Sequence, residues 1–307
     1  MAVVVALLMV PLLGLAAVSV DVAVMYADRQ QLQTGADAAA LAVAQTCATD
    51  PCDQTSAAQI ATPLVQANKN DAAASATTEL TAARATVRAQ TTREHFFAPV
   101  LGVDQSDIGT EATVAWGAPT GGTSVLPLAF SLCEWQKQLA TNGGELSETT
   151  LQTIFFTKTS GTTCTGPSGN LVPGGFGWLT PDPGTCDATT GAGGIHYSDP
   201  GASVPSGCTT QDFADTQFQT VLLPLFDYYD GTGSSAIYRV YGYAAFKVTG
   251  YHFVGRYSWN ASGSCKGSVR CLQGYFVEYV DTSDAFDYGA APDLGAAVAE
   301  LVLPDGG

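Results

Sequence analysis

Eight cysteines are the residues of this chain whose type and spacing point most directly to chemistry. Cysteines pair as disulfides or bind zinc, but no Cys-x2-Cys pair is present and the three histidines do not stand beside cysteines at ligand spacing. An even number of cysteines in glycine-rich loop sequence favours disulfides and an oxidising compartment. The eight are Cys47, Cys52, Cys133, Cys164, Cys186, Cys208, Cys265 and Cys271.

The pairing of these cysteines is only partly constrained, because eight cysteines allow roughly a hundred connectivities. Closure of short loops and chain order favour four pairs: Cys47 with Cys52, Cys265 with Cys271, Cys133 with Cys164, and Cys186 with Cys208. We expect all eight thiols to be oxidised. Each bridge would contribute about 2–4 kcal/mol to stability.

Residues that could perform acid–base or metal chemistry are few. The sequence contains no Gly-x-Ser-x-Gly, His-Glu-x-x-His, Gly-x-Gly-x-x-Gly or phosphate-loop motif. His196 could pair with Asp199, although a loop histidine is more often a hydrogen-bonded surface residue. His252 is expected to pack among aromatic strand residues, and Glu278 to lie on a solvated strand face. We expect no catalytic residue, no metal and no cofactor.

An acidic turn near Asp227 is the remaining candidate for metal binding. It combines Asp227, Asp230 and the segment 231–233, Gly-Thr-Gly. It lacks the Asp-x-Asp-x-Asp-Gly spacing of the common calcium loop, so an ordinary turn is the favoured interpretation.

The first residues form an uncharged apolar run from Ala2 to Val20. A helix of about 20 apolar residues crosses a hydrocarbon core of about 30 Å. No basic residue precedes Arg29 and the helical pattern continues beyond the run, which favours a retained membrane helix over a cleaved signal peptide. The expected membrane-helix residues are Ala2, Leu7, Leu8, Pro11, Leu15, Val20 and Asp21, with Tyr26 and Arg29 at the outer margin.

The segment that follows the apolar run is rich in small residues. It reads as a continuation of the same helix and presents a shallow face for close helix packing. The residues of that face are Leu32, Gly35, Ala36, Ala39 and Val43.

Beyond the long helix, the pattern predicts a small unit made of strand, short helix and strand. A short amphipathic helix is expected over 54–68, although Pro63 weakens it, and a strand over 78–90. One or two helical turns over 94–101 end at Gly102, and a returning strand covers 109–116. Residues 117–123 are expected to be a linker or a domain boundary.

The remaining chain reads as a mainly β domain with long loops. The best strands are 152–158, 238–249, 274–280 and 297–303, and a helix is expected over 210–220 with Thr209 or Thr210 as its N-cap. The expected class is therefore α+β, with a long N-terminal transmembrane helix (1–48), a small α/β unit (49–118) and a β-rich, disulfide-bonded extracellular domain (119–307).

The charge balance excludes two classes of partner. With 12 Lys and Arg against 28 Asp and Glu, the net charge is −16. Binding to nucleic acid or docking on anionic lipid requires clusters of basic residues, so neither is expected. Strong negative charge instead favours solubility outside the cell.

The segment 19–42, Ser-Val-Asp-Val-Ala-Val-Met-Tyr-Ala-Asp-Arg-Gln-Gln-Leu-Gln-Thr-Gly-Ala-Asp-Ala-Ala-Ala-Leu-Ala, resembles the N-terminal segment of the TadE/TadG-like proteins of the Tad (Flp) pilus-assembly system. Segments 130–134, 174–179, 221–227, 241–251 and 271–277 are similar to the larger, actinobacterial TadG-like members with a cysteine-containing C-terminal domain. The chain departs from some TadG proteins because it has no Asp-x-Ser-x-Ser motif, of which 281–284 holds only a fragment. Metal-dependent adhesion is therefore not carried over.

This resemblance implies a structural or assembly subunit, minor pilin or pseudopilin-like, of a Tad/Flp type IV pilus that supports filament initiation or tip formation and surface adherence. Its partners would be other pilus subunits, assembly-machine proteins and the membrane, in an oligomeric or filament-associated state at the cell surface. The alternative is a membrane-anchored extracellular adhesin or accessory binding module outside the filament. An enzyme is not expected.

Overall fold

The chain forms two compact units, each with its own core. The computed structural model describes residues 2–303, of which the side chains of 2–7, 10–13, 158, 159 and 234 are not described. The first unit comprises Met1–Ala115 with Ala299–Gly307, and the second comprises Trp116–Val298. The class is α+β, as expected, with a helical N-terminus and a mainly β second unit.

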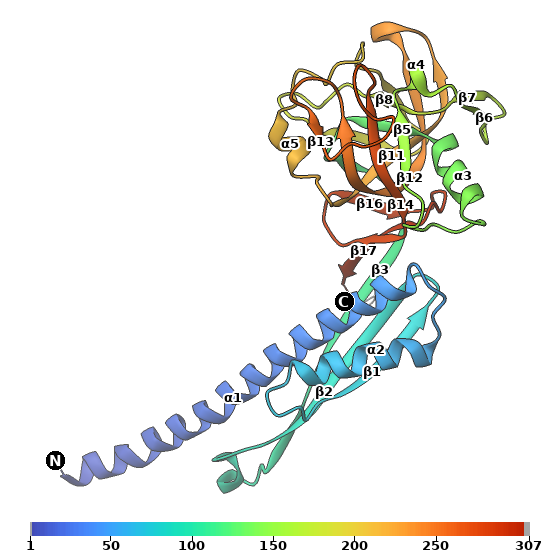
Figure 1. The fold of residues 1–307 in the computed structure, drawn as a ribbon. Helices are drawn as coiled ribbons and strands as arrows, with labels where there is room; N and C mark the ends of the chain where they lie inside the picture. Colours follow the sequence, from blue (N-terminus) through green and yellow to red (C-terminus); the bar gives the residue numbers. More distant parts are fainter. Residues whose placement is uncertain (1, 304–307) are drawn as a thin grey trace. The chain divides into compact units, whose positions relative to one another are not determined.

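The first unit combines two helices with the antiparallel strands β1, β2 and β3 (Figure 1). Strand β3 contributes residues to both units. The elements are α1 (Ala2–Cys47), α2 (Gln54–Ala67), β1 (Ser75–Thr81), β2 (Arg84–Glu94), the 3-10 helix η1 (Ala98–Leu101) and β3 (Gln105–Ser124).

Helix α1 continues without a break across the change from the apolar run to the small-residue segment. Alanine is its commonest residue and has the highest helix propensity. After α1, Asp53 begins α2 by accepting a hydrogen bond from the Ser56 amide. The short helix expected over 54–68 is confirmed, and its buried residues Ala57, Ala61 and Val65 recur at a spacing of four.

Close approach of α1 to α2 depends on the small residues of α1. A Cβ atom added to Gly35 would lie 3.1 Å from Val65 Cα and 3.2 Å from Asn68 Cβ, so glycine lets the two helices approach at this point. Leu32, Ala36, Ala39 and Val43 are fully buried, as are Ala40 and Ala44. The small-residue face of α1 therefore packs within its own unit.

The sheet of the first unit is an antiparallel β1-β2-β3 meander. In β2, Ala85, Val87 and Ala89 are buried and alternate with more exposed polar residues, as a sheet with one covered face requires. The single strand expected over 78–90 was wrong, because Ala82 and Ala83 form a hairpin turn between β1 and β2. Residues 117–123 are not a linker, because β3 continues through them to Ser124, but the boundary between the two units, at Ala115 and Trp116, lies directly before this segment.

The second unit is built from short strands, three short α-helices and one 3-10 helix among its described residues. Strand β17, like β3, contributes residues to both units. The elements are β4 (Leu128–Ser131), α3 (Leu132–Thr141), β5 (Gln152–Phe155), α4 (Thr157–Ser160), β6 (Thr163–Thr165), β7 (Leu171–Pro173), β8 (Phe176–Trp178), β9 (Ala188–Gly191), β10 (Ile195–Tyr197), α5 (Thr210–Ala214), β11 (Thr220–Asp230), η2 (Gly233–Ser235), β12 (Ile237–His252), β13 (Ser258–Trp259), β14 (Cys271–Val277), β15 (Tyr279–Asp281), β16 (Phe286–Gly289) and β17 (Ala296–Val302).

The core of the second unit lies on a sheet of order β5-β14-β12-β11-β4-β8. Phe130 is fully buried and makes edge-to-face contacts with Phe176, Phe246 and Phe276. Trp178 is also buried, so the aromatic residues of the glycine-rich run fill the core. The helix expected over 210–220 is confined to α5, which Thr209 and Asp212 begin with a capping box.

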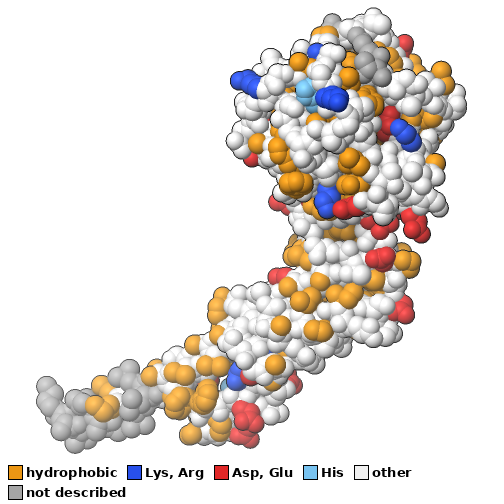
Figure 2. All heavy atoms as spheres, viewed as in Figure 1, with side chains coloured by type: hydrophobic (Ala, Val, Ile, Leu, Met, Phe, Trp, Pro, Cys, Tyr) orange, Lys and Arg blue, Asp and Glu red, His pale blue; other side chains and the backbone are white. Residues whose placement is uncertain are grey.

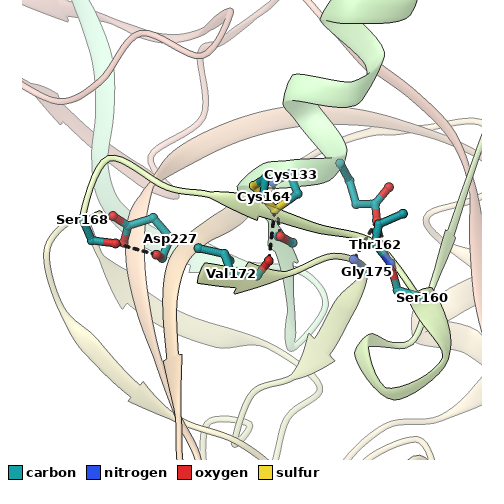
Figure 3. The surroundings of a disulfide bond; sticks show 10 residues. Cys133, Ser160, Thr162, Cys164, Ser168, Val172, Gly175 and Asp227 are labelled. Carbon is teal, nitrogen blue, oxygen red and sulfur yellow. Dashed lines mark hydrogen bonds between the residues drawn. A yellow bond between two sulfur atoms is a disulfide. The ribbon is translucent and has the colours of Figure 1, made fainter. Parts of the chain in front are cut away.

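The four disulfides join the pairs expected from loop closure and chain order. They are Cys47–Cys52, Cys133–Cys164, Cys186–Cys208 and Cys265–Cys271. Cys133 lies in α3 and Cys164 in β6, and hydrogen bonds order the segments around this bridge (Figure 3). The buried carboxylate of Glu134 accepts them from the Gly175 amide at 2.7 Å and the Thr162 hydroxyl at 3.1 Å.

The substitution Ala39→Leu tests the packing of α1. The added side chain has no room on the buried face, so we expect a loss of about 1–3 kcal/mol in the free energy of unfolding of the first unit. The control Ala27→Leu places the same side chain on an exposed position of the same helix and should be nearly neutral. Urea unfolding followed by circular dichroism measures the difference, and equal stability of the two variants would contradict this packing.

Candidate functional site

Two buried aspartates on one face of α1 connect the helix to the sheet of its own unit. Asp21 and Asp28 are 7 residues apart, which is close to two helical turns. Their exposed fractions are 4% and 3%. Burial of a charged carboxylate is unfavourable unless it is paired or hydrogen-bonded, so the partners of each define what the site does.

Asp28 is neutralised by two cations from different elements. Lys69 Nζ, just after α2, lies 2.9 Å from Asp28 Oδ1, and an Arg93 amino group, on β2, donates to the same carboxylate at 2.8 Å. Lys69 is itself buried, and it also contacts Asp71 at 3.1 Å. This cluster of Asp28, Lys69, Asp71 and Arg93 joins α1, the end of α2 and β2.

The charge state of the cluster follows from its hydrogen bonds. Donation by Arg93, reinforced by Lys69, lowers the pKa of Asp28 below its usual value despite burial. The pKa of Arg93 is raised by the same contact. Both groups are therefore charged at neutral pH.

Asp21 binds the tip of the β2–β3 hairpin through backbone amides. Its carboxylate accepts hydrogen bonds from the amides of Phe96 (2.8 Å), Phe97 (2.9 Å) and Ala98 (2.8 Å). The tip continues as η1 and ends at Gly102, whose left-handed conformation (φ 82°) closes the turn. The helical turn expected to end at Gly102 is confirmed. The last residue predicted for the membrane helix therefore lies buried, beside this hairpin.

Only some of the predicted membrane-helix residues have side chains that the structure describes. The side chains of Ala2, Leu7 and Pro11 lie outside the described residues. Leu8, Leu15 and Val20 are exposed on α1, with Leu15 at 69%, and Tyr26 and Arg29 are exposed beyond them. Within the described part of the chain, no helix reaches the length and apolarity needed to cross a membrane.

The five residues predicted for helix packing lie together on α1, and their partners belong to the chain itself. Gly35 is buried against Val65 and Asn68, and Leu32, Ala36, Ala39 and Val43 have no exposed surface. In this structure the helix that packs on this face is α2 of the same chain. An intermolecular contact of α1 would have to use its remaining faces.

The titratable residues of the second unit have ordinary partners. Asp227 lies within β11, where it is buried and Arg239 donates to it at 3.0 Å and 2.7 Å, so it does not belong to an acidic turn. The expectation for His252 was wrong: it is partly exposed and hydrogen-bonded to the Ser258 hydroxyl and the Gly267 carbonyl. Glu278 is exposed between β14 and β15. Among the described residues, no group of His, Cys, Asp and Glu could hold a metal ion.

His196 lies at a shallow hollow of about 370 Å³ in the second unit. Its Nε2 accepts a hydrogen bond from the Gly191 amide at 3.3 Å, and burial lowers the pKa of the imidazole. Burial also raises the pKa of Asp199. Among the described contacts of His196, none is a hydrogen bond to Asp199. Exposed Ile195 and Tyr197 flank the histidine.

Neither the partners of Asp21 and Asp28 nor the apolar hairpin tip was predicted from the sequence. The residues that meet Asp28 are 41 and 65 positions away, which no local pattern reveals. The apolar tip could have been predicted, because residues 96–103, Phe-Phe-Ala-Pro-Val-Leu-Gly-Val, contain no charged or polar side chain.

Comparison with known proteins gives one match, to the N-terminal segment. Residues 1–46 match the family model described as putative Flp pilus-assembly TadE/G-like. The matched segment ends one residue before α1 does. No curated protein and no solved structure matches the chain.

The substitution Asp28→Asn tests the buried cluster. It leaves Lys69 and Arg93 without their main counter-charge, and we expect a loss of about 3–5 kcal/mol in unfolding free energy at pH 7. Asp50→Asn, at an exposed position just past α1, is the control and should stay close to wild type.

The same variant has a defined pH dependence. Because the folded-state pKa of Asp28 is lowered, its stabilisation is complete above the unfolded value of about 4 and is lost as pH falls through the lower folded value. The wild-type chain should therefore lose stability on acidification more steeply than Asp28→Asn. Parallel slopes in urea unfolding between pH 6 and pH 3 would contradict the assignment.

Proposed function

We propose that this chain is a membrane-anchored structural subunit of the Tad (Flp) pilus system, minor pilin or pseudopilin-like. In this proposal the apolar run of α1 lies in the membrane before assembly, and the second unit is presented outside the cell. The observation that carries the proposal is the match of residues 1–46 to the TadE/G-like family model, which coincides with α1 almost residue for residue.

The exposure of side chains along α1 supports different roles for the parts of the helix before and after Asp21. From Asp21 onward, one face is buried against the sheet and α2, whereas the described apolar residues before it, including Leu8, Met9 and Leu15, are exposed. Exposed apolar surface on a helix requires a lipid or protein partner. Lipid would cover this apolar surface before assembly, and neighbouring subunits would replace the lipid in the filament.

The composition of the second unit supports its placement outside the cell. Three of the four disulfides lie in it, and structural disulfides persist in oxidising compartments. The net charge of the whole chain, −16, also favours a soluble surface. Its size, most of the chain, suits initiation or tip formation better than a densely repeated shaft.

We propose further that the protein acts by contact rather than by catalysis. Asp227 is held by Arg239, His252 by Ser258 and Gly267, and His196 by Gly191. These groups have structural partners, whereas acid–base catalysis needs groups free to meet a substrate.

An adhesin or accessory module outside the filament is the second candidate. The hollow beside His196, flanked by Ile195 and Tyr197, favours it because exposed apolar and aromatic side chains around a cavity can bind a ligand. The two candidates differ in whether the protein co-purifies with sheared filaments or stays with the membrane.

The substitution Leu15→Glu tests the role of the apolar run. A charge in the hydrocarbon weakens insertion by about 3 kcal/mol, so both the alkali-resistant membrane fraction and the number of surface filaments should fall in a complemented deletion strain. The matched control Leu171→Glu changes a residue of the same type and similar exposure, 70%, in the second unit. It should restore filaments to the level of the wild-type gene.

Three outcomes separate the alternatives. Normal filaments and adherence in the deletion strain would remove the pilus assignment. Normal filaments in the deletion strain with lost adherence would favour the adhesin. Failure of a folded His196→Ala/Glu278→Ala variant to complement would reopen the case for chemistry in the second unit.

A further inference from the structure

The tip of the β2–β3 hairpin is an exposed apolar surface without an assigned role. Five large apolar side chains of residues 96–103 are exposed, and Val100 reaches 90%. They are Phe96, Phe97, Val100, Leu101 and Val103. In the view of Figure 2, hydrophobic side chains gather at the end of this unit nearest the N-terminal part of α1. Contiguous apolar exposure of this kind marks an interaction site.

Most backbone amides of the tip are hydrogen-bonded within the chain, and a lipid environment favours such internal pairing. Asp21 accepts from the amides of Phe96, Phe97 and Ala98. The amides of Val100, Gly102 and Val103 donate to carbonyls of residues 97–99, and Pro99 has no amide hydrogen. Such pairing contributes about 1 kcal/mol per hydrogen bond in water, and it matters more in lipid, where an unpaired amide has no alternative partner.

The position of the tip along α1 is fixed by the same carboxylate. Asp21 directly follows the uncharged run Ala2–Val20, whose length as a helix is about 28 Å at roughly 1.5 Å per residue. This is close to the hydrocarbon thickness of about 30 Å. The tip is therefore held at the level where the proposed membrane span ends, with exposed Tyr26 on the next turns of α1.

We propose that this tip inserts into the lipid interface as a second anchor beside α1. The inference rests on the membrane span of the proposed function. Aromatic and branched apolar side chains partition into the boundary between headgroups and acyl chains. Because residues 96–103 contain no Lys or Arg, insertion would be hydrophobic and would not require anionic lipid.

Lipid is a better occupant than a second copy of the chain. Helix association in membranes favours small residues that let backbones approach closely, whereas the tip presents bulky side chains on a turn of a few residues. The small-residue face of α1 that could receive such a partner is already filled by α2 and β2. Two anchor points joined through Asp21 would restrict the tilt of the first unit on the membrane.

Fluorescence quenching in vesicles tests this proposal on the full chain. The variant Val100→Trp places a probe at the tip, and Ala83→Trp places one in the β1–β2 turn, at the other end of β2. Each is reconstituted in phosphatidylcholine vesicles that carry bromine on the upper acyl chain, and the signal of the four native tryptophans is subtracted with wild-type protein. We expect strong quenching and a blue-shifted emission for Val100→Trp and neither for Ala83→Trp.

Resistance to alkaline washing, measured on the same vesicles, tests the α1 anchor separately. Retention of the protein with an unquenched Val100→Trp probe would overturn the tip insertion and leave the proposed function intact. A blue-shifted but unquenched probe would mean that protein covers the tip, and would also overturn it. Quenching of a protein that alkali extracts would support the tip and remove the α1 span.

Discussion

The architecture of the first unit depends on two buried carboxylates on one face of α1. Asp28 is paired with Lys69 and Arg93, and Asp21 accepts three amide hydrogen bonds from the β2–β3 tip. Buried charges are stable only when their partners are in place, so each carboxylate fixes the helix at one position relative to the sheet. The small residues from Leu32 to Val43 then extend the same face and allow close packing against α2. The helix thereby acquires a defined register on its unit.

This arrangement divides α1 into two parts with different requirements. Beyond Asp21, one face of the helix is covered by other residues of the same chain. Before Asp21, the described apolar side chains remain exposed and need an external partner. The match of residues 1–46 to a TadE/G-like Flp pilus-assembly model spans both parts. In the proposed assembly subunit, the carboxylate contacts would join the exposed N-terminal part of α1 to the folded first unit. The second unit, stabilised by an aromatic core and three disulfides, needs no contribution from the helix for its own packing.

Sequence patterns predicted the elements that local chemistry determines. Asp53 and the spacing of Ala57, Ala61 and Val65 define α2, and loop lengths favoured the four disulfide pairs that form. The β1–β2 hairpin escaped prediction because its turn, Ala82–Ala83, has none of the usual turn residues. Segment 117–123 resembles a linker in composition but is a strand, because β9 and β16 supply hydrogen-bonding partners that lie far away in the sequence. The Asp28 cluster could not be predicted either, because its members lie far apart in the sequence and meet only in the folded unit.

Amide hydrogen exchange of the hairpin tip tests the central claim, that Asp21 holds the tip on α1. The measurement compares the peptide covering residues 94–104 in the full-length wild-type chain, in Asp21→Ala and in the control Asp37→Ala. If Asp21 is the acceptor for the Phe96, Phe97 and Ala98 amides, their protection should be lost in Asp21→Ala alone, while α2 and β1 remain protected. Unchanged protection of the tip in Asp21→Ala would contradict the account.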